Sequence, residues 1–323
     1  MNLQSLLNLM KMTKKLPIVF LLLFICSCFR VEEKLEPKIS YNLKEAHVKT
    51  LKNAFKPITL EERSQDWGKE FIIAKKFAKE LDLYRAITNF RRAEILLGDD
   101  NLYRKQEIEY NITLSYYLGQ KFDDAIDYFE KSSLCYVDKS FAAFKDLLII
   151  LYESYRETKN EDKTQKIIEL LKDNYPETEK KILLSTALLD ANVDTLKEDY
   201  PKNQNIQNMI SSYEREKKSV KTAQLLNTFI PGSGYLYIGQ KKSAATAFFL
   251  NALFIYASYD FFHRGWTAAG TITASFEAGW YFGGIYGAGE EANYYNERIY
   301  ESKATPLLNR DRLFPIFLIK YGF

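Results

Sequence analysis

The chain has 323 residues, enough for two or three domains, and its charged residues (27%) nearly cancel to a net charge of +3. This balance gives no strong electrostatic field for nucleic acid or acidic partners. Aromatic residues make up 15% of the chain, which suits helical repeats, membrane interfaces or both. Because the two histidines lie far apart in the sequence and near no cysteine, a zinc site of the usual kind is not expected.

The first 28 residues follow the order of a secretory signal. Three lysines between residues 11 and 15 precede an apolar core at 16–25, and small or sulfur residues follow. This core is shorter than the roughly 20 residues of a spanning helix. Residues 25–28, ICSC, resemble the bacterial lipobox, and the resemblance implies cleavage before Cys28 and attachment of a lipid to its sulfur. The alternatives are an uncleaved signal anchor and an ordinary signal that is cut elsewhere.

We therefore expect residues 1–27 to be a signal peptide of the lipoprotein type, with acyl chains such as palmitate held by Cys28. Two or more acyl chains anchor a protein stably, whereas a single chain is marginal. Residues 28–63 have mixed charge, two prolines and no clean period. This pattern is typical of a tether that leads into the first helix of a folded domain.

Residues 64–218 are predicted to form helical repeats. Three blocks, at 70–97, 108–136 and 147–176, each contain an apolar helix, a short polar turn and a second apolar helix. The blocks resemble the tetratricopeptide repeat (TPR), although their offset of about 39 residues exceeds the 34 of that family. In the third block Thr164 stands where the family has a small residue. The residues that carry the resemblance are Phe77, Ala86, Phe90, Ala93, Tyr116, Ala125, Phe129, Tyr155, Ile168, Leu171 and Pro176.

A TPR-like array implies stacked helical hairpins with a concave surface that binds peptides or proteins. The repeated aromatic residues are interpreted as the core of the array and not as a ligand site. Residues 178–218 continue the helical pattern as a fourth unit or a capping helix. The alternative to an array is an irregular helical bundle.

Residues 219–298 are predicted to form a transmembrane helical hairpin. Segments 243–262 and 267–288 carry almost no charge, and at 1.5 Å per residue each is long enough to cross the hydrocarbon. The preceding segment, PGSGYLYIGQ at 231–240, resembles a motif of small bacterial two-transmembrane hairpin domains, a group without a settled activity. The alternative is a buried hairpin of a soluble protein. The motif residues are Pro231, Gly232, Gly234, Tyr237 and Gly239.

Two polar residues lie near the middle of the predicted spans. A lone carboxylate in lipid is costly, so Glu277 is expected to be neutral or paired. We expect Asn251 and Glu277 to form a hydrogen bond across the hairpin and to hold the two helices in register. The alternative is a proton or ion path, in which the hairpin associates with further copies of itself.

The sequence thus predicts an all-α fold, with a TPR-like array, a transmembrane hairpin and a C-terminal tail at 299–323 whose apolar end, 313–323, docks on the protein or at the interface. We expect an adaptor at the bacterial cell envelope that binds a protein partner, on the inner membrane, with the repeats outside the cytoplasm. No catalytic constellation or phosphate loop is present, so neither catalysis nor a cofactor is predicted. The alternative is a small membrane component for transport or insertion in which Glu277 is functional.

Overall fold

The computed structural model describes residues 31, 33–39 and 44–323, so the predicted signal peptide and Cys28 lie outside the described residues. The described chain is built from packed helix pairs, which confirms the all-α prediction. It divides into two compact units. The array unit comprises Ile39–Gln207 and Ala304–Phe323, and the hairpin unit comprises Asn208–Lys303 with the described residues up to Lys38.

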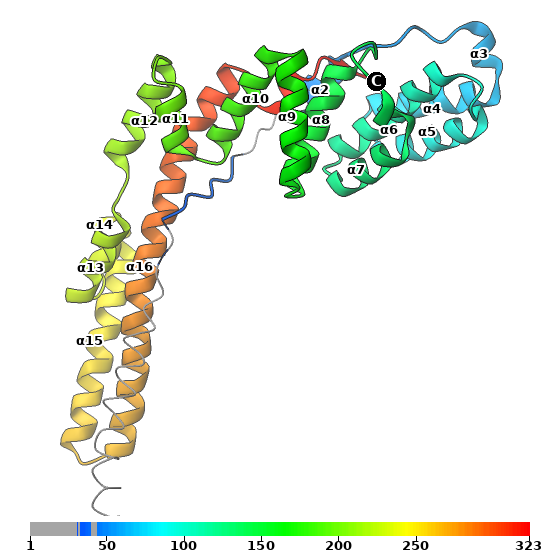
Figure 1. The fold of residues 1–323 in the computed structure, drawn as a ribbon. Coiled ribbons are helices and arrows are strands. Elements are labelled where there is room, and N and C mark those ends of the chain that lie inside the picture. Colours follow the sequence, from blue (N-terminus) through cyan, green and yellow to red (C-terminus); the bar gives the residue numbers. More distant parts are fainter. Residues whose placement is uncertain (1–30, 32, 40–43) are drawn as a thin grey trace, which may run out of the picture. The chain divides into compact units, whose positions relative to one another are not determined.

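In the array unit, helices that follow one another in the sequence pack as pairs, α4 with α5, α6 with α7, α8 with α9 and α10 with α11 (Figure 1). The helical elements of this unit are α2 (Lys44–Lys49), α3 (Leu60–Ser64), α4 (Asp66–Lys79), α5 (Leu83–Leu97), α6 (Leu102–Leu118), α7 (Phe122–Lys131), the 3₁₀-helix η1 (Ser133–Tyr136), α8 (Phe144–Glu157), α9 (Glu161–Asn174), α10 (Pro176–Leu189), α11 (Val193–Asp199) and α17 (Pro315–Leu318). Two short strands, β1 (Lys52–Asn53) and β2 (Tyr321–Gly322), complete it.

The turns inside the four pairs have the same backbone geometry. Leu81, Gln120, Lys159 and Ala191 all have positive φ, and the next N–H donates to a carbonyl five residues back, as from Asp82 to Phe77. The first three of these turns are spaced by 39 residues, the same offset as the sequence blocks. The second helix then begins at an Asp or Asn cap in three of the pairs. The pairs are therefore true structural repeats.

The hairpin unit contains a long antiparallel helix pair. Its helices are α12 (Gln204–Glu216), α13 (Val220–Phe229), α14 (Ser233–Tyr237), α15 (Lys241–His263) and α16 (Thr267–Arg310), and α12 and α16 each extend into the array unit. The first half of α16 runs beside α15 after a turn at 264–266 in which Gly265 has a φ of 76° (Figure 1). The chain thus reverses within three residues.

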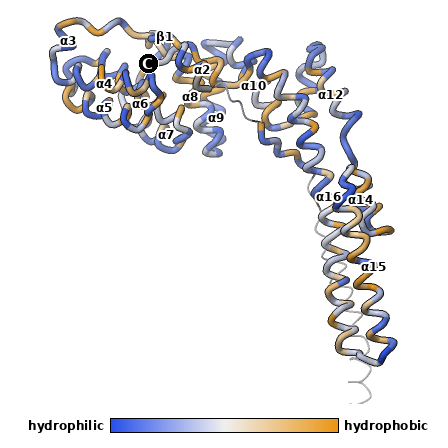
Figure 2. The backbone as a smooth tube through the Cα atoms, turned by 180° about the vertical axis from the view of Figure 1, so that it is seen from behind, coloured by the Kyte–Doolittle hydropathy of each residue, from blue (hydrophilic) through white to orange (hydrophobic). Residues whose placement is uncertain are grey.

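The prediction of two membrane spans is met in part. Within the described residues, α15 is the one helix that is long and apolar enough to cross a membrane, and most of its surface is exposed. Its apolar character is visible in Figure 2. The second expected span, 267–288, is the first half of α16 and does not reach the same threshold. Its many Gly, Thr and Ser residues and Glu277 lower its hydropathy, so a transmembrane hairpin is not established.

The segment predicted as a tether is folded where the structure describes it. In the hairpin unit, residues 33–38 run along α16, where Glu36 and Lys38 donate their N–H groups to Glu297 and Glu301. In the array unit, residues 44–64 form α2, β1 and α3. Contacts with distant residues, and not local periodicity, order these residues, which is why the sequence pattern gave no sign of them.

Candidate functional site

The last residues of the described chain pack across the helix pairs of the array unit, on a surface that we call the groove. We call residues 313–323 the tail. Helix α17 of the tail packs against α8 and α10. Further along, Tyr321 contacts α6 and α8 through its main chain, and the Phe323 ring lies over Phe90, with 6.4 Å between ring centroids. The tail therefore crosses the array from α10 towards α4.

The groove binds the main chain of the tail. The buried carboxylate of Asp146 accepts hydrogen bonds from the N–H groups of Lys320 (2.8 Å) and Tyr321 (2.6 Å). The Tyr110 hydroxyl donates to the Tyr321 carbonyl oxygen at 3.2 Å, and Lys145 Nζ donates to the Leu318 carbonyl oxygen at 3.1 Å. These groups recognise main-chain atoms, at the end of α17 and in the extended residues after it, and not a particular side chain.

Burial controls the electrostatics of this contact. It raises the pKa of the Asp146 carboxyl, while the N–H donors of the tail and the nearby Lys145 ammonium oppose that shift. Burial also raises the pKa of the Tyr110 hydroxyl. An ionised carboxylate in a buried place needs donors to compensate for lost hydration. The two N–H groups of the tail supply that compensation.

A second extended segment lies in the groove beside the tail. We call residues 51–57 the inner segment. Its strand β1 pairs in parallel with β2, so that Lys52 lies opposite Tyr321 and Asn53 opposite Gly322. Phe55 is buried among aromatic rings, with centroids 5.7 Å from Tyr110 and 5.5 Å from Phe141. The groove thus holds a two-stranded ribbon made of its own chain.

A buried arginine fixes the inner segment. Arg104 Nη1 and Nη2 donate to the carbonyl oxygens of Lys56 (2.8 Å) and Pro57 (3.0 Å). The same guanidinium pairs with Glu62 at 2.8 Å and Glu107 at 2.5 Å. Its hydrogen bonds lower the pKa of Glu62 to about 2. Every N–H group of the Arg104 guanidinium donates a hydrogen bond, so this side chain stabilises the fold and we assign it no chemical role.

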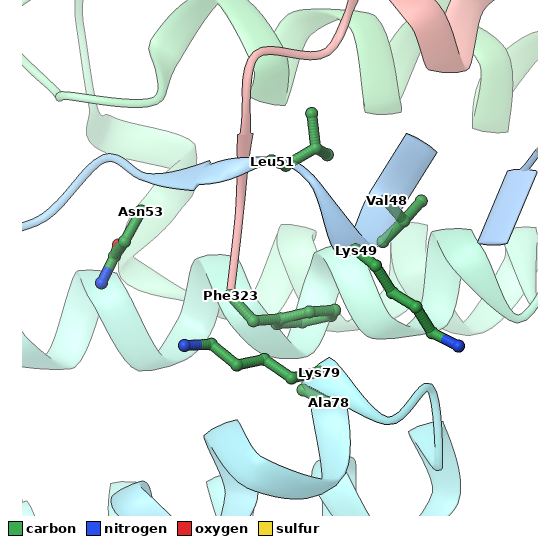
Figure 3. Close-up of a pocket in the computed structure, with 7 residues that line it drawn as sticks. All are labelled: Val48, Lys49, Leu51, Asn53, Ala78, Lys79 and Phe323. Atoms are coloured by element: carbon green, nitrogen blue, oxygen red, sulfur yellow. The ribbon is translucent and has the colours of Figure 1, made fainter. Parts of the chain in front are cut away.

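A cavity of about 230 Å³ lies next to the end of the tail. Figure 3 shows the Phe323 ring between Lys49 on one side and Ala78 and Lys79 at the end of α4 on the other. About half of the wall is polar, with Lys49, Asn53 and Lys79 beside the apolar side chains of Val48, Leu51 and Ala78. The lining residues are Val48, Lys49, Leu51, Asn53, Ala78, Lys79 and Phe323. Among the described residues, no cluster of His, Cys, Asp and Glu side chains is placed to hold a metal ion.

The predicted membrane motif forms a tight elbow in the hairpin unit. Gly232 has a φ of 92°, and a Cβ there would lie 2.2 Å from the Ala244 carbonyl oxygen. A Cβ at Gly234 would lie 2.3 Å from the Ala223 carbonyl oxygen. The elbow therefore needs these two glycines to bring α13, α14 and α15 together.

The other motif residues have different surroundings. Pro231 precedes α14, and Gly239, with a φ of 87°, has open space around it. The Tyr237 hydroxyl accepts a hydrogen bond from the Ser219 N–H, and its ring packs on a small core around Val31. Through Tyr237, the motif therefore packs against the cluster that contains Val31, the first described residue.

The expected hydrogen bond between Asn251 and Glu277 is not formed, so that prediction is wrong. Asn251 Nδ2 donates instead to the Ala247 carbonyl oxygen, one turn back on its own helix. Asn251 Oδ1 and Glu277 Oε2 are buried and have no hydrogen-bond partner among the described residues. The surrounding surface of α15 and α16 exposes large apolar side chains, among them Phe248, Phe249, Leu253, Ile255, Ile272 and Phe276.

Sequence reasoning missed the residues that hold the tail. The one available signal was Asp146 at the start of the apolar run FKDLLIILY, where a charged residue interrupts a buried helix. Comparisons of the chain with protein-family models, with curated proteins and with solved structures find no match. The site is therefore interpreted from its own geometry.

Proposed function

We propose that this protein is a membrane-anchored adaptor of the bacterial cell envelope whose TPR-like array binds an extended segment of a partner protein. The observation that carries the proposal is the groove of the array unit, where Asp146, Tyr110 and Lys145 bind an extended backbone. Such stacked helix pairs offer a long surface for peptide recognition. No catalytic step is part of this proposal.

Membrane attachment is supported by the hairpin unit. Helix α15 is 23 residues long and exposes its apolar side chains, which in water costs free energy in proportion to their area. We propose that residues 243–262 and 267–288 lie in the inner membrane and that the lipid on Cys28 adds a second anchor. Helical spans favour the inner over the outer membrane, where proteins span as barrels.

Crosslinking followed by purification from detergent-solubilised membranes tests the adaptor role. The full chain is compared with Asp146→Asn, which weakens the backbone contact in the groove, and with Asp173→Asn, an exposed site on α9, as matched control. We expect a partner that the full chain and the control capture and that Asp146→Asn loses. Equal capture by all three chains would contradict binding through the groove.

A second candidate function is a membrane component for transport or insertion. The buried, unpartnered oxygens of Asn251 and Glu277 favour it, because such groups in an apolar helix pair mark ion or substrate paths. Glu277→Gln separates the two functions. If the protein is an adaptor, the Glu277→Gln chain still captures its partner. If it is a transport component, this chain still captures its partner but loses transport activity.

A further inference from the structure

We infer that the tail is an exchangeable occupant of the groove, and that a partner binds by inserting a segment of the same pattern, one helical turn followed by an extended stretch, in its place. This inference rests on the proposed function, since it names the class of ligand and how access to the groove is controlled. The ligand is a polypeptide with two adjacent main-chain N–H groups and apolar residues placed like Ile316, Ile319 and Phe323, all three of which are buried.

The hydrogen bonds of the tail do not depend on its side chains, most of which are buried by apolar packing. Asp146, Tyr110 and Lys145 all contact main-chain atoms of the tail. The Lys320 side chain is exposed. Another segment that adopts the same extended conformation would make the same hydrogen bonds, because every non-proline residue carries the same backbone groups.

The tail fills its groove incompletely. The cavity of about 230 Å³ beside Phe323 has the apolar side chains of Val48, Leu51 and Ala78 in its wall (Figure 3). About half of the wall is polar, and the apolar part beside the Phe323 ring has unused packing contacts. A ligand with a bulkier residue at the Phe323 position would gain those contacts and compete with the tail.

The connection of the tail to α16 permits it to leave. Helix α16 ends at Arg310, and Arg312 follows with a φ of 51°. The Leu313 N–H donates to the Leu308 carbonyl oxygen, so this connection has the same turn as the helix pairs. Rotation at these two or three residues would release the tail while α16 stays intact. Arg312 is held in place by His47, with 3.2 Å between Nη2 and Nδ1.

The groove is unfavourable when empty. Without the tail, the buried Asp146 carboxylate would lose both of its N–H donors, and one of its oxygens already has no hydrogen-bond partner in the described chain. Departure of the tail is therefore coupled to arrival of another backbone. This coupling favours exchange of one segment for another over a groove that stays empty.

A fluorescent synthetic peptide with the sequence of residues 313–323 tests the inference in the detergent-solubilised full chain. Ile319→Ala combined with Phe323→Ala weakens the tail, and Lys320→Ala is the matched control. We expect the weakened chain to bind the peptide at least about tenfold more tightly than the natural chain, because its tail occupies the groove in a smaller fraction of molecules. The control should bind like the natural chain, and a scrambled peptide should bind to none. If the peptide binds equally to all of the chains, or binds to none of them, the inference is overturned.

Two further measurements keep the test decisive. The peptide N-methylated at the positions of Lys320 and Tyr321 should lose binding, because it has no N–H for Asp146. If the double variant does not fold, hydrogen exchange of the natural chain replaces it: the Lys320 and Tyr321 amides should exchange at least about tenfold faster than those of Ile149 and Ile150 in α8. If the amides of the tail and of α8 exchange at the same rate, the tail is a permanent part of the core and the inference is overturned.

The two proposals fail separately. Peptide exchange without any captured partner would confirm that the tail is exchangeable, but it would remove the adaptor role and the partner segment with it. A captured partner that remains after Asp146→Asn, together with no peptide exchange, would leave an adaptor that uses another surface.

Discussion

Glu62 connects the start of the array to its buried arginine. It caps α3 through Thr59 and pairs with Arg104 Nε at 2.8 Å, and the side chain is 18% exposed. The hydrogen bonds from Arg104 and from the Thr59 N–H lower its pKa from 4.5 to about 2. A carboxyl with a lowered pKa stabilises the fold above its unfolded pKa and loses that contribution as pH falls through the folded value.

We therefore expect Glu62→Gln to lower the free energy of unfolding at pH 7 by about 2 kcal/mol. Glu61→Gln is the matched control, since Glu61 is the exposed neighbour, and it should change stability little. Urea denaturation of the detergent-solubilised chain measures both variants. The difference between them should shrink between about pH 4.5 and pH 2, where Glu62 becomes protonated in the natural chain. A difference that stays constant with pH would contradict the assignment.

We expect His47 to make docking of the tail sensitive to pH. Its ring packs edge-on against Phe317, and burial together with Arg312 lowers its pKa below 6.5. A histidine with a lowered pKa binds fewer protons folded than unfolded, so its neutral form supports the fold above pH 6.5 and that support is lost as pH falls. We expect the Lys320 and Tyr321 amides to exchange faster, relative to α8, at about pH 5.5 than at about pH 7.5. His47→Gln should abolish this extra acceleration, and an acceleration that persists would place the sensitive group elsewhere.

The α13–α14–α15 elbow depends on two close backbone approaches. We expect Gly234→Ala to destabilise the hairpin unit by about 3 kcal/mol, because the added methyl meets the Ala223 carbonyl. Gly279→Ala is the control, since it lies in α16 with open space around it and should be neutral or stabilising by up to about 1 kcal/mol. Thermal unfolding followed by circular dichroism in detergent compares them. Equal melting temperatures would mean that the elbow is not tightly packed.

The helix pairs were predictable because their information is local. Apolar residues at helical spacing and polar turns lie within each block, and the turns at Leu81, Gln120 and Lys159 keep the 39-residue step. The ribbon in the groove was not predictable. Its strands have two residues each and lie at opposite parts of the chain, so neither has a period of its own. The predicted hydrogen bond between Asn251 and Glu277 does not form, because the Asn251 amide donates to the Ala247 carbonyl oxygen of its own helix.

Across the whole molecule, two separate means of membrane attachment are proposed. We expect the Cys28→Ser chain to lose palmitate labelling and yet to stay in the membrane pellet after an alkaline carbonate wash, because α15 remains. The natural chain is the reference for labelling, and a peripheral membrane protein released by the wash is the control. Release of the Cys28→Ser chain would show that the hairpin unit does not span.

The pairing of β1 with β2 has a consequence for biogenesis. The array unit receives its last strand only from residues that follow the entire hairpin unit in the sequence. A ribosome makes the chain in that order, so the helices of the array are synthesised long before the segment that covers Asp146. The hairpin unit can therefore fold before the array is complete. Any product shortened before residue 313 would expose the apolar surface that the tail buries to chaperones and proteases.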